Sequence, residues 1–393
     1  MKKVALFVGL AAALGFTNAQ AVDWNWKGDV RYRYQSDLKH TDGAQGEHSR
    51  DRHRARVRLG VYPWINEELS SGVQISTGSA TETTSRNETL DDQFLADPVY
   101  LNEYFVDYHP MAYGLNGAVN VILGKRAVAS DLVVVNDLVW DSDLTFEGVT
   151  LQYGKDGDGK EKDGINAAAG FYPLNERSSR TAVGEQDAYL VAAQAAYKGE
   201  ISDLNYQIGA GYYNYVNFDV KNKSVAASQL TVAPYTYTPA TTAAYSPEYD
   251  YTGKDFNIVE LFGSVGGQIT ETLPWKVTGQ YAFNTAKNSA RYSKIDNAKR
   301  DSYLAEIKIG DAKQVGQWSL NADYVRIEAD ALTVLTDSDR NAGSATNLKG
   351  FKIGGVYHLV QNLTVGANYF NFKSIDVSNV TNHLLMADVV VKF

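Results

Sequence analysis

The stretch Arg52-His53-Arg54-Ala55-Arg56-Val57-Arg58-Leu59-Gly60-Val61-Tyr62 alternates basic and apolar residues along nearly its whole length. Successive side chains of a β-strand point to opposite faces, so the arginines would share one face and the alanine, valines and leucine the other. A soluble barrel needs an apolar interior, which a strand with this basic face does not supply. The stretch therefore predicts a strand in a wall that separates water from an apolar medium.

The preceding segment, 24–36, has the same two-faced pattern. Its apolar and aromatic positions are Trp26, Gly28, Val30, Tyr32 and Tyr34, and its charged positions are Lys27, Asp29, Arg31 and Arg33. If the two strands pair, the arginines of the first extend the basic face of the second.

Strand-like segments continue to the carboxyl end and give sixteen strands in all. They are expected at Trp24–Ser36, Arg52–Tyr62, Leu69–Gly78, Val99–Tyr108, Ala118–Gly124, Phe146–Gly154, Ile165–Tyr172, Ala188–Lys198, Leu204–Asn217, Asp255–Gly267, Trp275–Asn284, Ser302–Gly310, Gln317–Glu328, Leu348–His358, Leu363–Phe372 and His383–Phe393. Short connections alternate with long polar ones. An even strand number with this asymmetry is typical of a closed antiparallel transmembrane barrel.

The composition agrees with an all-β membrane protein. The 393 residues include 26 Tyr, 14 Phe and 6 Trp but no Cys, and 37 Lys+Arg face 46 Asp+Glu. The acidic balance disfavours a nucleic-acid partner, and disulfides are excluded. Beyond Phe16 no apolar run is long enough for a spanning helix. Alternating strands average to this polar, aromatic-rich composition.

The amino terminus resembles a secretory signal, with a basic start, an apolar stretch to Phe16 and the cleavage motif Ala19-Gln20-Ala21. We expect residues 1–21 to be removed and residues 22–393 to form a single barrel domain. The export signal and the barrel together predict an outer-membrane location, with membrane lipid around the wall.

Charge placement then predicts a pore. Arginine in the middle of a lipid-facing barrel surface costs about 2–4 kcal/mol, so the basic face should line the lumen. We expect these residues to be Arg31, Arg33, Arg52, Arg54, Arg56 and Arg58. A salt-bridge network within the wall is the structural alternative, and the two roles are compatible.

The segment from Gly124 to Asp143 is the expected opposite side of the pore. It interleaves aliphatic residues and Trp140 with the acidic residues Asp131, Asp137, Asp141 and Asp143. So much apolar surface favours packing inside a barrel wide enough to hold a loop. The carboxylates would then face the arginines across a narrowed channel and create a transverse field. An external loop for recognition or subunit contact is the alternative.

Several of these segments resemble the bacterial "putative porin" family, which is related to the general trimeric porins. The matching residues are Gly28–Tyr34, Arg52–Val61, Ser76–Gly78, Asn87–Leu90 and Leu138–Val149. The resemblance covers about the first 155 residues. It implies a passive diffusion channel for small hydrophilic solutes and ions, with an inward-folded third loop, a homotrimer as one assembly state and no cofactor.

The resemblance also concerns the last strand, where a terminal aromatic such as Phe393 is the usual signal to the barrel-assembly machinery. Asp388 departs from the small residue common at its position.

A barrel could also serve two other functions. A barrel enzyme needs a nucleophile and a base at one rim, and no such set is evident around the six histidines. A recognition barrel could act through the long loop Phe218–Lys254. No metal site is expected, because the histidine spacing does not suit one. The turn Asp156–Gly164 fails the EF-hand pattern at Lys160, although whether it binds a cation is left open.

Overall fold

A computed structural model describes residues 22–41, 48–80, 82–112, 115–156, 159–176, 187–218, 256–286, 299–377 and 379–393. The expected signal segment 1–21 lies outside the described residues, as does the long loop after Phe218. Within the described ranges, no helix combines the length and apolarity needed to cross a bilayer.

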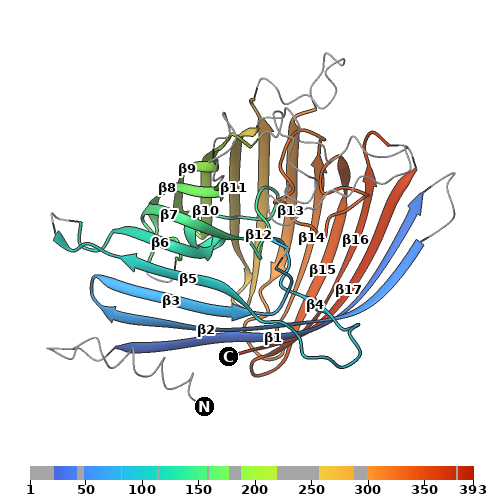
Figure 1. Cartoon of the computed structure of the whole chain (residues 1–393), viewed down its shortest axis with the longest axis horizontal. Coiled ribbons are helices and arrows are strands. Elements are labelled where there is room, and N and C mark those ends of the chain that lie inside the picture. Colours follow the sequence, from blue (N-terminus) through green and yellow to red (C-terminus); the bar gives the residue numbers. More distant parts are fainter. Residues whose placement is uncertain are drawn as a thin grey trace, which may run out of the picture.

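The chain forms a closed antiparallel barrel of sixteen long strands, arranged in sequence order (Figure 1). All sixteen predicted strands are present, with ends shifted by a few residues. The strands are β1 (Asp23–Thr41), β2 (His48–Asn66), β3 (Leu69–Ser76), β5 (Tyr100–Tyr108), β6 (Val119–Ala127), β7 (Thr145–Tyr153), β8 (Gly164–Asn175), β9 (Ala188–Ile201), β10 (Leu204–Val216), β11 (Phe256–Thr270), β12 (Leu273–Asn284), β13 (Asp301–Gly310), β14 (Trp318–Ile327), β15 (Leu348–Val360), β16 (Leu363–Ser374) and β17 (Val380–Lys392). A two-residue strand, β4 (Glu88–Thr89), and a one-turn helix, α2 (Val128–Asp131), lie in the connections.

The first and last strands close the barrel. β1 pairs with β17 from Asp29 opposite Lys392 to Thr41 opposite Val380. Gly28 and Phe393 then exchange two backbone hydrogen bonds, of 2.8 and 3.1 Å. An open strand edge has no partner for its backbone groups in lipid, so this pairing is required for a membrane-spanning sheet.

The two faces of the wall follow the predicted alternation. Val57 and Leu59 of β2 are 43% and 39% exposed on the outer face, whereas Arg54 and Arg56, which precede them in alternate positions, are each 7% exposed on the inner face. The outer face of β17 likewise carries Leu385 and Val389. The outward apolar belt suits contact with lipid, and Arg54 and Arg56 lie on the opposite, inner face.

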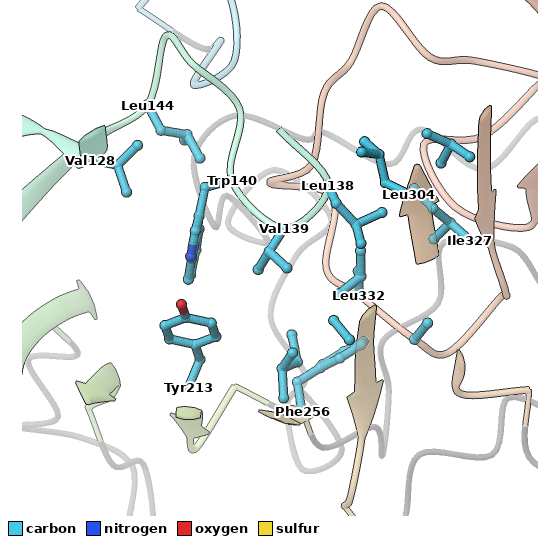
Figure 2. Close-up of a cluster of buried hydrophobic side chains, with 14 of the residues drawn as sticks. Val128, Leu138, Val139, Trp140, Leu144, Tyr213, Phe256, Leu304, Ile327 and Leu332 are labelled. Atoms are coloured by element: carbon cyan, nitrogen blue, oxygen red, sulfur yellow. The ribbon is translucent and has the colours of Figure 1, made fainter. Parts of the chain in front are cut away.

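The inner faces of β7 to β17 are more apolar than the sequence led us to expect. Near the ends of the strands that carry the long loops, their side chains join loop residues in one buried apolar cluster (Figure 2). Trp140 is packed edge-on against Tyr213 of β10 and Phe146 of β7, with ring centroids 4.8 and 5.0 Å apart. Part of the lumen is therefore a packed core, because the loops that bury these side chains are themselves apolar.

Closure can be tested at Gly28. A Cβ there would lie 2.6 Å from the carbonyl oxygen of Arg58 and 2.7 Å from the ring of Phe393. Gly28→Val should therefore reduce the yield of folded barrel in membranes, which heat-dependent mobility on SDS gels measures. Gly279→Val is the matched control, because a Cβ on this outer-face glycine has no neighbour within 4 Å. Equal folded yields of the two variants would contradict the role of this contact.

Candidate pore constriction

The register of β1 and β2 brings the arginines into two adjacent rows. Arg31 lies opposite Arg56, and Arg33 lies opposite Arg54. Arg58 is next in its row, opposite Asp29. We call these five arginines, together with Arg52, the arginine ladder. Like charges this close need carboxylates or water between them, so their partners define the chemistry of the site.

Two wall carboxylates pair with the ladder. Asp29 accepts hydrogen bonds from Arg56 Nε at 2.9 Å and from Arg58 Nε at 2.6 Å. Asp388 of β17 accepts hydrogen bonds from Nε and Nη2 of Arg33 at 2.7 and 2.8 Å, which makes a bidentate pair. The sequence showed Asp388 only as a departure from a terminal pattern. The closure register explains it, because Asp388 lies opposite Arg33.

The third loop, 128–144, contacts the inner faces of distant strands. The Val133 amide donates to Gln194 Oε1 of β9 at 2.6 Å, and the Gln194 amide donates back to the Val133 carbonyl at 2.9 Å. Asn136 donates to Glu306 of β13 at 2.9 Å. These paired contacts fix the backbone of the loop against wall side chains.

One of the four loop aspartates reaches the ladder. Asp143 lies 3.3 Å from Arg56 Nη1 and 3.5 Å from Arg58 Nη1. Asp131 accepts a hydrogen bond from Thr150 at 3.0 Å, and Asp137 is 2.6 Å from Arg340. Asp141 accepts from the amide of Ser338 at 3.3 Å. The structure thus brings Asp143 to the arginines and places the other three in separate contacts.

The seventh loop, 328–347, packs against the third loop. The sequence pattern alone had not drawn attention to it. Thr336 Oγ1 donates to the Leu138 carbonyl at 2.6 Å, and the Asp141 amide donates to the Leu335 carbonyl at 2.8 Å. Its run Leu332-Thr333-Val334-Leu335-Thr336-Asp337 mixes apolar and acidic residues much as the third loop does. The same signal was therefore present and could have predicted the packing.

Arg340 holds the seventh loop in place. Its side chain has no exposed surface and lies 2.6 Å from Asp137, 3.4 Å from Asp323 of β14 and 3.7 Å from Asp337. Lys352 adds a second cation, 3.3 Å from Asp323. The cluster links both loops to the wall. Asp339, one residue before Arg340, lies 3.6 Å from Arg33 of the ladder.

Carboxyl groups of the third and seventh loops meet where the two loops touch. Burial, first, and the charges of Asp337, Asp143 and Asp339 together raise the pKa of Asp141 to about 9, although the amide of Asp143 opposes them. Burial and the neighbouring Asp137 and Asp339 raise the pKa of Asp337 to about 7, with Arg340 opposing. The contact between the loops therefore favours protonated carboxyls.

The turn Asp156–Gly164 shows no ligand arrangement in its described part. Asp156 Oδ1 accepts the Lys160 amide at 2.9 Å, and Lys155 is 3.2 Å from Glu161. Among the described residues, no group of three or more His, Cys, Asp or Glu side chains is arranged to hold a metal ion.

An apolar outer belt, a closed antiparallel sheet and inward arginines define a transmembrane β-barrel with a charged lumen. The family model described as "Putative porin" matches residues 13–256 and 229–393, so the chain belongs to this porin family. It is a porin of the bacterial outer membrane. No curated protein matches the chain.

Solved porin structures share the fold at low sequence identity. OprB of Pseudomonas putida is 11% identical, with 94% of each chain covered and a TM-score of 0.55. The outer-membrane channel DcaP of Acinetobacter baumannii is 12% identical, with 96% of this chain and 99% of that chain covered and a TM-score of 0.53. OmpF of Salmonella typhi, solved with daunomycin, is 13% identical, with 94% of this chain and 97% of that chain covered and a TM-score of 0.51. These likenesses establish the barrel architecture.

Replacing Arg340 tests the loop packing. Arg340→Met leaves Asp137, Asp323 and Asp337 without their main counter-charge, at a cost of about 3–5 kcal/mol for a broken buried cluster. The seventh loop should then detach. The chain has no cysteine, so Thr336→Cys, fully buried in the parent, can report this through maleimide labelling.

In this assay we expect Thr336→Cys to stay unlabelled alone and to react once Arg340→Met is added. Arg326→Met is the matched control, because Arg326 lies on the outer face, 3.1 Å from Glu328. Continued protection of Thr336→Cys in the Arg340→Met protein would show that the cluster does not hold the loop.

The carboxyl contact predicts a pH effect. Both folded pKa values lie above the ordinary value of 3.8, so the contact is strongest in acid and weakens as the pH rises through about 7 and about 9. Single-channel current should become larger or noisier across this range as the loops loosen. Asp141→Asn should flatten the response, whereas Asp311→Asn, in a turn at the opposite end, should keep it. Identical profiles for the parent and Asp141→Asn would exclude this role.

Proposed function

We propose that this porin is a passive diffusion channel whose narrowest part lies between the arginine ladder and the third and seventh loops. The contact of Asp143 with Arg56 and Arg58 carries the proposal, because it puts a loop carboxylate at 3.3 and 3.5 Å from the basic wall. Opposite charges at a constriction order water, favour small hydrophilic solutes and ions, and penalise apolar ones.

The lumen beside this contact is polar enough for such solutes. A cavity of about 320 Å³ is lined by Asp29, Arg58, Gln74, Glu103 and Asp143, among others. A second cavity of about 450 Å³, near the short-turn end, is lined by charged and aromatic side chains that include Lys27 and Trp64. A solute that passes the ladder would thus meet further charged and hydrogen-bonding groups.

The inward folding of the third loop and its role in the constriction belong to the same proposal. Contacts of Val133 and Asn136 with β9 and β13 support it. We further propose that the apolar belt contacts lipid, that the barrel assembles as a homotrimer, and that Phe393 serves the assembly machinery.

Planar-bilayer recording tests the channel directly. Purified, folded protein should give stepwise ohmic current increments. Arg54→Ala combined with Arg56→Ala should shift the reversal potential in a salt gradient towards cation preference, because two positive charges leave the lumen wall. Arg326→Ala, which removes an outer-face arginine, should leave it unchanged. Folded protein without current would refute the channel, and an unchanged reversal potential would refute the role of the ladder.

A further inference from the structure

Five of the six arginines of the ladder fall into two groups by the charge of their partners. Arg33, Arg56 and Arg58 each contact carboxylates at 3.6 Å or less, from Asp29, Asp143, Asp339 and Asp388. A carboxylate cancels the charge of a guanidinium at short range. These three positions are therefore largely neutralised by groups of the protein itself.

Arg31 and Arg54 instead have neutral partners. Arg31 donates through Nε and Nη2 to the side-chain oxygen of Asn87, at 3.2 and 2.5 Å. Arg54 donates to the amide oxygen of Gln35, the hydroxyl of Ser85 and the backbone carbonyl of Asn87, at 3.3, 3.3 and 3.2 Å. Amide and hydroxyl oxygens satisfy hydrogen bonds without removing charge.

Carboxylates near these two guanidiniums are few. In the described part of the chain, no carboxylate oxygen lies within 4.0 Å of Arg31. The one such contact of Arg54 is Glu82 at 4.0 Å, whose side chain is 49% exposed. A pair that long and that exposed is screened by water. The buried Nε of Arg54 also has no hydrogen-bond partner. Arg31 and Arg54 therefore retain positive charge on the inner wall.

Asn87 is fixed in its place by backbone pairing. β4 pairs with β2, with Thr89 opposite Arg54, and the Leu90 amide donates to the His53 carbonyl at 2.9 Å. Ser85 holds the Asn87 side chain through its hydroxyl, at 3.2 Å. The second loop, 77–99, thus places Asn87 beside both arginines, with its neutral side-chain amide on Arg31 and its backbone carbonyl on Arg54. A carboxylate in place of this amide would neutralise positive charge at this point of the wall.

We propose that Asn87 is a specificity-determining residue that leaves Arg31 and Arg54 uncompensated, and that the channel consequently favours small carboxylate anions. The neighbouring arginines already bind carboxylates of the protein. Arg33 donates two hydrogen bonds to Asp388, and Asp29 accepts one from each of Arg56 and Arg58. A solute carboxylate offers the same geometry to a guanidinium. This proposal rests on the proposed channel function and adds the class of solute.

The test is Asn87→Asp, a change of nearly equal shape that adds one negative charge in contact with Arg31 and beside Arg54. Reversal potentials in potassium acetate gradients give the permeability ratio of acetate to potassium. The parent should prefer acetate. In Asn87→Asp the ratio should fall about fivefold, the factor for one charge at about 4 Å in water.

Two further variants separate charge from structure. Asn87→Ala removes the amide but adds no charge, so it should keep the preference for acetate. Asn116→Asp adds the same charge in an exposed periplasmic-side turn and should change the ratio far less. A parent that conducts without anion preference, an unchanged ratio in Asn87→Asp, or an equal fall in Asn87→Ala would overturn the proposal. Folded parent protein with no current would instead refute the channel itself.

Discussion

The pairing of β1 with β17 is the contact on which the rest of the structure depends. Backbone groups inside a bilayer find no water, so the sheet must satisfy all of them by closing. Closure also decides the chemistry of the lumen. It puts Asp388 opposite Arg33, while the pairing with β2 on the other side puts Arg31 opposite Arg56. The charged wall is thus assembled from three strands, with the arginines on β1 and β2 and Asp388 on β17.

The other side of the lumen depends on apolar packing rather than charge. The third and seventh loops bury Leu138, Trp140 and Leu332 against the inner faces of β7 to β17. Burying such side chains contributes about 1.5–3 kcal/mol each, which offsets the entropy of ordering the loops. Their carboxylates Asp143 and Asp339 then contact the ladder. A hydrophobic core inside the barrel thereby positions the charged groups of the proposed constriction.

The strands and their number could be predicted because both depend on local alternation of residue types. The partners of the arginines could not, since they depend on register between distant segments. Asp388 meets Arg33 only after closure, and Asn87 meets Arg31 only because β4 pairs with β2. Of the predicted acidic residues, Asp143 reaches the ladder, and the rest serve contacts with Thr150, Arg340 and Ser338.

The seventh loop illustrates a different limit. Its mixture of apolar and acidic residues was visible in the sequence, but its role became clear only with Arg340 buried between the loop and the wall. A lone arginine in a polar loop gives no sign of burial by itself. The partners of Arg340 are Asp137 on the third loop, Asp323 on β14 and Asp337 on its own loop. Only the fold brings these residues together.

The most direct test of the account is whether the third loop borders the conducting path. Ser142 is exposed, lies between Asp141 and Asp143, and lines the same cavity as Arg58. A bulky thiol reagent applied to open channels of Ser142→Cys should reduce the single-channel current in one step. Glu176→Cys, exposed beyond the end of β8, should conduct as before under the same reagent. Full current through labelled Ser142→Cys would contradict the proposed constriction.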